Sequence, residues 1–230
     1  MASLRLFPES LFPHPWAVAT GIGAELASGR LVTDVIASLF RVFSGFLLAV
    51  ILGIPAGLLL GHSRLARDAF LPVVNFFRSL SPLAWIPFAI LWLGIGDRPA
   101  IFLIFMAAFF PIVLSTSAAV ANIPSVFFRV AQDLGIEGPR LLGEVTLPAI
   151  APQVITTLRV TAGLSWLVVV AAEMIAGRDG LGFAVWDARN GLRIDLLAGS
   201  MLVIGLIGVA LDRLLVQLTK ISSVRWGYER

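Results

Sequence analysis

Residues 100–121 read AIFLIFMAAFFPIVLSTSAAVA and contain no charged side chain. An apolar run of about 20 residues is long enough to cross the hydrocarbon core of a bilayer as a helix. The whole 230-residue chain has a similar character, with 58% hydrophobic and only 13% charged residues. Soluble domains carry about 25% charged residues. The composition therefore excludes an ordinary soluble enzyme and a disordered chain, and it predicts an integral membrane protein.

Other segments are as long and as apolar as this one, so we expect an all-α membrane protein with about five transmembrane helices. Unbroken apolar runs without strict alternation favour helices over barrel strands. The expected spans are residues 35–61, 73–93, 100–121, 151–176 and 196–217. The charged residues within them are Arg41, Arg78, Arg159, Glu173, Asp212 and Arg213.

The first 34 residues are not expected to form a sixth span, because prolines and charged residues interrupt each apolar run. Nor do they have the basic start and clean apolar core of a signal peptide. We expect residues 16–30 to form a short amphipathic helix at the membrane surface. In the first span, Gly53, Gly57 and Gly61 form a small-xxx-small pattern, which we assign to packing within the chain rather than to a dimer contact.

The second span contains prolines that break its helix. Pro82 and Pro87 stand beside Trp85, and each proline removes a backbone donor. Carbonyl groups freed inside a membrane must face protein or a water-filled cavity, so residues 79–88 are candidates for lining a pathway. A packing kink is the alternative. The candidate pathway residues are Arg78, Ser79, Ser81, Pro82, Trp85, Arg159 and Glu173.

Ionisable residues within a span indicate function or a partner. Arg159 and Glu173 lie fourteen positions apart on one helix. They are separated by about 21 Å and cannot pair with each other. For Arg41, Arg78 and Arg159 taken singly, we expect a side chain that reaches the membrane surface rather than one that lines a pathway. We expect Asp212 to form a local ion pair with its neighbour Arg213 or a contact with lipid headgroups.

Residue types exclude several kinds of site. The chain has no cysteine and two distant histidines, His14 and His62, so a zinc site is not expected. The only lysine, Lys220, follows Thr219 rather than the glycine of a Walker A loop, so ATP is not bound in that way. With His62 expected in a loop, an intramembrane protease is disfavoured. No arginine-dense run with aromatics indicates nucleic-acid binding.

The numbers of basic residues expected on the two membrane sides are nearly equal, so the positive-inside rule leaves the orientation open.

Residues 122–150 form the longest polar stretch between apolar segments. Pro124 suits a helix start and Gly135 a helix stop, so we expect two short helical pieces on one membrane face. Loop 177–194 then lies on the opposite face. The stretch resembles the signature loop of binding-protein-dependent ABC importer permeases, which runs Glu-Ala-Ala, three residues, Gly, nine residues, Ile, one residue, Leu-Pro. Here the same spacing is filled by Arg129-Val130-Ala131, Gly135, Val145 and Leu147-Pro148, and Arg129 and Val130 depart from the pattern.

Residues 38–61, 79–97 and 171–188 are similar, more narrowly, to the nitrate, sulfonate/taurine and bicarbonate permeases, and the resemblance covers about 35–217. It implies a type I ABC importer transmembrane domain with a cytoplasmic coupling helix, which is a transport subunit and not an enzyme. Its small residues would let that helix sit closely on an ATPase. The residues implied to couple to the ATPase are Arg129, Ala131, Asp133, Gly135, Leu147 and Pro148.

The resemblance also implies partners. Two copies, or this chain and a similar permease, would pair around a central pathway in the lipid of a bacterial inner membrane. Two cytoplasmic ABC ATPase subunits would bind ATP and magnesium. A periplasmic or lipid-anchored binding protein would deliver a small anion (nitrate, bicarbonate or sulfonate/taurine), which crosses by alternating access. The resemblance therefore also implies the orientation, with residues 122–150 and the C-terminus on the cytoplasmic side.

The expected organisation is an N-terminal interfacial segment at residues 1–34, a transmembrane domain at 35–217 with its coupling loop at 122–148, and a cytoplasmic tail at 218–230. Permeases of this kind usually have one more helix before the first span, so we expect a five-helix variant or a shortened start. The alternative function is a stand-alone secondary transporter or channel. That alternative needs a coupling-ion site, and the spans hold no carboxylate cluster around Glu173.

Overall fold

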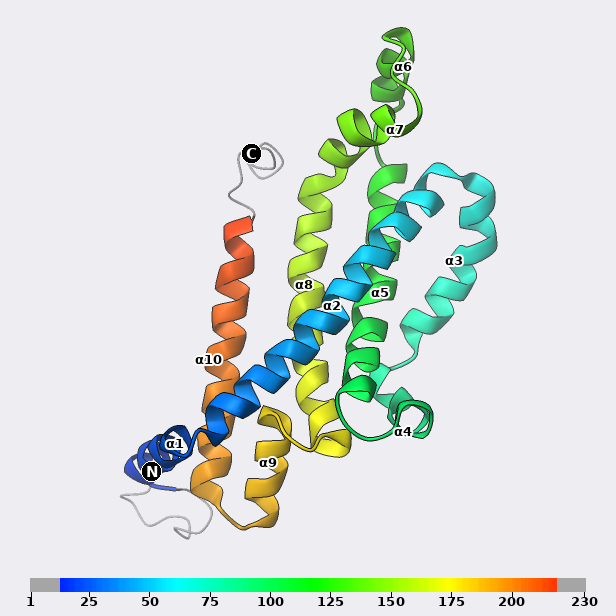
Figure 1. Ribbon diagram of the computed structural model, residues 1–230. Helices are drawn as coiled ribbons and strands as arrows, with labels where there is room; N and C mark the ends of the chain where they lie inside the picture. Colours follow the sequence, from blue (N-terminus) through cyan, green and yellow to red (C-terminus); the bar gives the residue numbers. More distant parts are fainter. Residues whose placement is uncertain (1–12, 219–230) are drawn as a thin grey trace, which may run out of the picture. The chain divides into compact units, whose positions relative to one another are not determined.

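The computed structural model describes residues 13–218, and no β-strand occurs among them. The expected all-α architecture is confirmed. Figure 1 traces the elements in order: α1 (Pro15–Ala27), α2 (Arg30–His62), α3 (Arg64–Ser79), the 3-10 turn η2 (Pro82–Trp85), α4 (Ile86–Leu93), α5 (Asp97–Ala121), α6 (Ser125–Asp133), α7 (Gly138–Leu141), the π-helical turn η3 (Leu142–Thr146), α8 (Leu147–Ala176), α9 (Leu181–Asn190) and α10 (Ile194–Leu218).

Helices α2, α5, α8 and α10 are long and apolar enough to cross a membrane, and α3 with η2–α4 forms a broken pair that supplies up to one more span. The helix break falls at Leu80 and Ser81, just before Pro82, as the prolines predicted. One expectation is wrong: His62 does not lie in a loop but is the last residue of α2. The loop at 177–194 contains a further helix, α9.

The helices pack as two compact units, each built from segments far apart in the sequence. Of the described residues, the first unit comprises 13–45, 82–105 and 165–211. The second comprises 46–81, 106–164 and 212–218. Helices α2, α5, α8 and α10 each run from one unit into the other as a continuous helix. Their directions can therefore be read from contacts within each unit.

Helix α2 packs closely along α5 in the second unit because glycines line its contact face. A Cβ at Gly57 would lie 2.5 Å from the Cβ of Thr116, and a Cβ at Gly61 would lie 2.5 Å from the Cβ of Val120. Gly53 meets α5 in the same way. The partner residue advances by four as the glycine does, so α2 and α5 run in the same direction. The expectation of packing within the chain is confirmed, and side chains at these glycines would push the helices apart.

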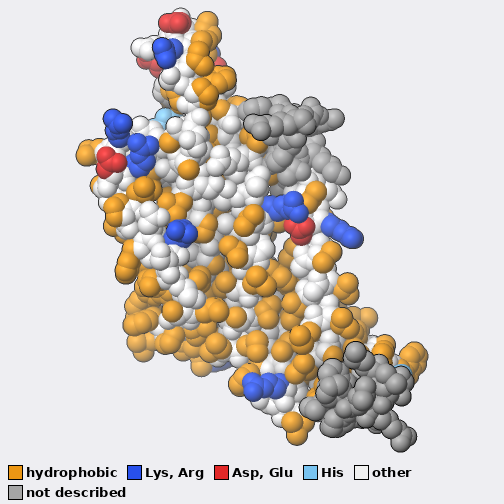
Figure 2. All heavy atoms as spheres, turned by 180° about the vertical axis from the view of Figure 1, so that it is seen from behind, with side chains coloured by type: hydrophobic (Ala, Val, Ile, Leu, Met, Phe, Trp, Pro, Cys, Tyr) orange, Lys and Arg blue, Asp and Glu red, His pale blue; other side chains and the backbone are white. Residues whose placement is uncertain are grey.

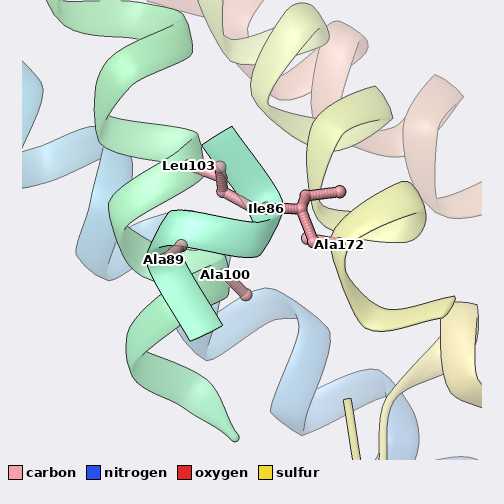
Figure 3. Close-up of a cluster of buried hydrophobic side chains, with 5 residues drawn as sticks. All are labelled: Ile86, Ala89, Ala100, Leu103 and Ala172. Atoms are coloured by element: carbon pink, nitrogen blue, oxygen red, sulfur yellow. The ribbon is translucent and has the colours of Figure 1, made fainter. Parts of the chain in front are cut away.

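Helix α8 runs in the opposite direction to α5. In the second unit, the hydroxyl groups of Ser115 on α5 and Thr157 on α8 are hydrogen-bonded at 2.5 Å. In the first unit, Ala100 near the start of α5 shares a buried cluster with Ala172 near the end of α8. Figure 3 shows this cluster, in which Ile86 of α4 reaches the same place. Early residues of α5 thus meet late residues of α8.

Helix α10 runs in the opposite direction to α8. In the first unit, the indole nitrogen of Trp166 donates to the carbonyl of Ile204 at 3.2 Å. In the second unit, Nε of Arg159 donates to Asp212 at 2.7 Å. The expectation that Asp212 pairs locally or with headgroups is therefore corrected, because its carboxylate binds a guanidinium on α8.

By length and composition, α2, α5, α8 and α10 are four candidate crossings, and the broken pair of α3 with η2–α4 supplies up to a fifth. The expected number of about five transmembrane helices agrees with this range.

The surface of the helices is strongly apolar. Figure 2 shows hydrophobic side chains over much of the visible face, with few charged groups among them. In α10 only 6% of the most apolar 18-residue stretch is buried. Such a surface is stable against lipid or another subunit rather than in water.

The N-terminal helix also has a defined place in the first unit. The helix expected at residues 16–30 is α1, and a Cβ added at Gly199 of α10 would lie 2.9 Å from Cγ1 of Ile22. Helix α1 therefore packs against the start of α10. Residues 1–12 of the expected interfacial segment, and the expected tail from Thr219 onward with Lys220, lie outside the described residues.

Candidate functional site

The expected coupling loop folds as two short helices, α6 and α7, followed by the turn η3. Helix α6 ends in a Schellman motif at Gly135, whose φ is +68°. The N–H of Ile136 donates to the carbonyl of Ala131 at 2.8 Å, and the N–H of Gly135 donates to that of Gln132 at 3.0 Å. This motif requires a left-handed residue, which glycine adopts without strain. The helix stop predicted at Gly135 is confirmed.

The candidate coupling residues divide by exposure. Ala131 is only 2% exposed, so its small side chain is buried within the chain. Beside it, a mainly apolar cavity of about 950 Å³ extends along α6 and the start of α8. Gly135 also lies at the exposed end of α6. The candidates that the fold leaves exposed are Arg129, Asp133, Gly135, Leu147 and Pro148.

The coupling loop joins α8 through one π-helical turn. The N–H of Leu147 donates back to the carbonyl of Leu142, which adds a residue to the turn. The last residue of this turn, Thr146, is completely buried. Helical backbone then continues without a break to Ala176, so α7, η3 and α8 form one helical element from Gly138 onward. Turns of this type are frequent at functional sites.

A buried ionic network occupies the first unit, and Arg41 is its centre. Arg41 is 1% exposed, so the expectation that it reaches the membrane surface is wrong. Its Nη1 donates to Glu173 at 2.7 Å, and its Nε donates to Asp97 at 2.7 Å. The same guanidinium binds the carboxylate of Asp179 and donates to its carbonyl oxygen at 2.9 Å. One side chain of α2 therefore binds residues at the start of α5, near the end of α8 and in the loop after α8.

The network also caps α9. The backbone N–H groups of residues 180–182 donate to the side chains of Asp34, Ser38 and Glu173 at 2.8, 2.9 and 2.9 Å. The first N–H groups of any helix have no acceptor within the helix, and here these side chains provide the acceptors. A Cβ at Gly180 would lie 2.5 Å from the carboxyl carbon of Glu173, so only glycine allows this approach. The loop glycines thus serve the capping of a helix.

The candidate pathway residues are distributed over both units. In the second unit, Arg78 and Ser79 are exposed at the end of α3, followed by exposed Ser81, and Arg159 forms two hydrogen bonds with Asp212. Arg78 has no ion-pair partner among the described residues.

The candidates in the first unit have defined neighbours. Trp85 follows Pro82 in η2, and its ring packs near those of Phe88 and Trp92. Glu173 is 1% exposed and already bonded to Arg41. Glu173 is therefore a structural anchor in this conformation. No group of three or more His, Cys, Asp or Glu side chains that could hold a metal ion occurs in residues 13–218.

Comparison with known proteins identifies the family. Residues 49–226 match the family described as the binding-protein-dependent transport system inner membrane component. The chain belongs to this family. It is the permease subunit of an ABC importer, a multi-pass inner-membrane protein, and it is a transport subunit rather than an enzyme. ATP is handled by separate ATPase subunits in this family.

Three relatives share 38% identity with the chain. They are the nitrate import permease of Synechocystis, over 180 residues (78% of this chain and 66% of the relative); the bicarbonate permease of Synechococcus elongatus, over 191 residues (83% and 69%); and the taurine permease of Escherichia coli, over 217 residues (92% and 79%).

The fold of the permease is also that of a solved transporter. The structure is similar to a chain of the MetNI methionine ABC transporter in an inward-facing conformation, with a TM-score of 0.65 and 22% identity. The alignment covers 82% of this permease and 96% of that chain. This likeness confirms the type I importer fold.

The Arg41 network predicts a large effect on stability. Arg41→Met leaves the Glu173 carboxylate buried without its cation, which costs about 3–5 kcal/mol. The midpoint of thermal unfolding in detergent should fall accordingly. Adding Glu173→Gln should restore most of the loss, because the second change removes the unpaired charge.

The matched control for this prediction is Arg140→Gln. It breaks the exposed pair of Arg140 with Glu144, which is worth about 0–1 kcal/mol. Equal midpoints for Arg41→Met and Arg140→Gln would contradict the assigned role of the network.

Proposed function

We propose that this permease imports a small anion: nitrate, bicarbonate or a sulfonate such as taurine. The observation that carries the proposal is that permeases named for these three solutes are equally similar to the chain, each over more than three quarters of its length. The alternative of a stand-alone secondary transporter or channel has no comparable support. The family works with binding proteins, so a separate subunit is expected to choose among the three solutes.

In the proposed assembly, two copies of the permease, or this permease and a similar one, pair around the pathway. Two ABC ATPase subunits, which hold ATP and magnesium, bind at the coupling loop 122–148. The exposed side chains of α6 and the apolar cavity of about 950 Å³ beside it support this placement, because they offer an unfilled surface. A periplasmic or lipid-anchored binding protein docks at the opposite face.

This assembly sets the orientation. The coupling loop, the end of α10 and the tail 218–230 are cytoplasmic, while α9 and the Arg41 network lie toward the outside. The directions of α5, α8 and α10 support the relative placement, since they bring the loop and the end of α10 to one face. Residues 1–34 are proposed as the interfacial segment and 35–217 as the transmembrane domain.

Transport then follows from the continuity of the helical chain. The helical backbone is unbroken from Gly138 to Ala176, so a displacement of the coupling loop is passed along α8. At its outer end α8 carries Glu173, which holds α2 and α9 through hydrogen bonds. ATP binding and hydrolysis therefore move several helices together and alternate access to the pathway.

For the pathway itself, we propose the broken helix. The exposed polar side chains of Ser79 and Ser81 support this assignment, and the exposed Arg78 supplies a positive charge for an anion. Glu173 and Arg159 are instead assigned to holding helices together. The proposed lining residues are Arg78, Ser79, Ser81, Pro82 and Trp85.

Reconstitution tests the proposed function. The permease should co-purify with an ABC ATPase, and proteoliposomes that contain this complex and the binding protein should take up nitrate, bicarbonate or taurine when ATP is present. Uptake should stop when ATP is replaced by a non-hydrolysable analogue. Uptake without an ATPase partner would instead establish the stand-alone transporter.

Arg78 tests the pathway. Arg78→Ala should lower the rate of anion uptake several-fold, because it removes a charge from the route of the ion. Arg64→Ala, at the other end of α3, is the matched control and should leave the rate unchanged. Equal rates for the two variants would place Arg78 at the lipid surface.

Gly135 tests the coupling loop. Gly135→Val forces a branched side chain into left-handed backbone, at a cost of about 1–2 kcal/mol. The strain should displace the end of α6 and reduce uptake per ATP hydrolysed. Gly135→Asn should be milder, because asparagine tolerates this conformation. Gly143→Ala, where an added Cβ meets no atom within 4 Å, is the control. Unchanged uptake per ATP hydrolysed in Gly135→Val would contradict the assignment of 122–148 as the coupling loop.

A further inference from the structure

We propose that His62 is a positioning residue that links the coupling loop to α2, so that movement of the loop reaches α2 as well as α8. The proposal rests on the proposed role of residues 122–148 in coupling. It concerns residues outside the signature pattern of the loop, and it was not apparent from the sequence, which placed His62 in a loop without a role.

The imidazole of His62 contacts both parts of the coupling loop. Its Nε2 lies 3.3 Å from the hydroxyl oxygen of Thr146 in η3. Its ring meets the ring of Phe128 in α6 edge to face, with centroids 6.2 Å apart and an interplanar angle of 81°. Because His62 is the last residue of α2, this one side chain joins α2 to the beginning and to the end of the loop.

Hydrogen bonds at both ring nitrogens determine how the imidazole is held. Nδ1 lies 3.0 Å from the carbonyl oxygen of Leu58. A carbonyl oxygen only accepts, so Nδ1 carries a proton. In the neutral ring Nε2 is then an acceptor, and the hydroxyl of Thr146 donates to it. The ring is thus fixed in orientation by α2 itself and presents one acceptor to the loop.

Thr146 stands where the loop meets the span. Its side chain is fully buried, and a buried hydroxyl requires a hydrogen-bond partner. Among the described residues, His62 provides that bond. Thr146 also ends the π-helical turn, and a π-turn is a place where a helix bends or changes its register. The hydrogen bond therefore holds α2 to the point of the loop that is best suited to move.

Through α2, the hydrogen bond between His62 and Thr146 is also connected to α5. Four residues before His62, Leu58 begins the last turn of α2, and Gly57 next to it packs directly against Thr116 of α5. Close packing of this kind makes two helices move together rather than slide. A displacement of Thr146 that draws His62 with it therefore moves α2 and α5, in addition to the direct movement of α8.

The test uses the whole complex of permease, ATPase and binding protein in proteoliposomes. The ATPase rate and the uptake of nitrate, bicarbonate or taurine, whichever probe the unsubstituted complex transports, are measured on the same preparation. Thr146→Val keeps the shape of the side chain and removes its hydroxyl, and His62→Phe keeps an aromatic ring and removes the acceptor. Each should lower uptake per ATP hydrolysed by about 3- to 10-fold, the worth of one hydrogen bond.

Two features separate positioning from a loss of folding. Thr146→Ser, which restores a hydroxyl, should recover the coupling ratio. The double variant Thr146→Val/His62→Phe should be no worse than either single variant, because both changes remove the same bond. Thr33→Val is the control: its hydroxyl bonds only locally to the carbonyl of Gly29, and coupling should be unchanged.

Three results would overturn the proposal. An unchanged coupling ratio in Thr146→Val would show that the bond carries no displacement. Additive losses in the double variant would show that the two residues act separately. A parallel fall of ATPase and uptake would show a merely structural contact. If the unsubstituted complex transports none of the three probes on ATP, the proposed function fails as well, and that result is visible before any variant is measured.

Discussion

Burial of the Arg41 guanidinium among carboxylates is the interaction on which the arrangement of the first unit depends. A charge buried in an apolar environment is stable only when it is paired and hydrogen-bonded. Arg41 meets this condition through Glu173, Asp97 and Asp179, which come from α8, the start of α5 and the loop after α8. Satisfying one side chain of α2 therefore positions three other segments. The first amides of α9 complete the network, so its cost in desolvation is offset by caps that α9 would otherwise lack.

Helix α2 connects this network to the proposed coupling loop. Along its length it offers the Arg41 network, then glycines that allow close contact with α5, and finally His62 at its end. Each contact uses a different physical means: charge pairing, close van der Waals packing and a directed hydrogen bond. Because the helix is continuous, the three act on one element. A permease must pass a displacement from the ATPase side to the pathway, and a helix held in this way at both ends is suited to that task.

The sequence predicted the parts of this fold that depend on local composition. Apolar length located the four to five helices that could cross a membrane, prolines located the break before Pro82, and Gly135 located the end of α6. The motif spacing in 122–148 identified the family. These features succeed because each is decided by residues within one or two turns of the chain.

The sequence did not predict the contacts between distant residues. Arg41 was expected to reach the membrane surface, although a signal for its partner existed: Arg41 and Glu173 both lie near the same membrane face in the expected topology, and an intramembrane carboxylate needs a cation. The small side chain of Ala131 suggests close contact with a partner, and the sequence gives no sign that the chain itself buries it. The π-turn and the bond between His62 and Thr146 have no local pattern, since they arise only when α2 and the coupling loop are packed together.

The central claim is that the loop 122–148 is the surface that meets the ATPase. The chain contains no cysteine, so a single introduced thiol can carry a thiol-linked photo-crosslinker. We would place it at the exposed Arg129 or, for comparison, at the exposed Arg98, which the proposed orientation puts on the outer membrane face, in the assembled complex. The account predicts that the ATPase is captured from Arg129→Cys and not from Arg98→Cys. Capture from Arg98→Cys with none from Arg129→Cys would contradict both the coupling assignment and the orientation.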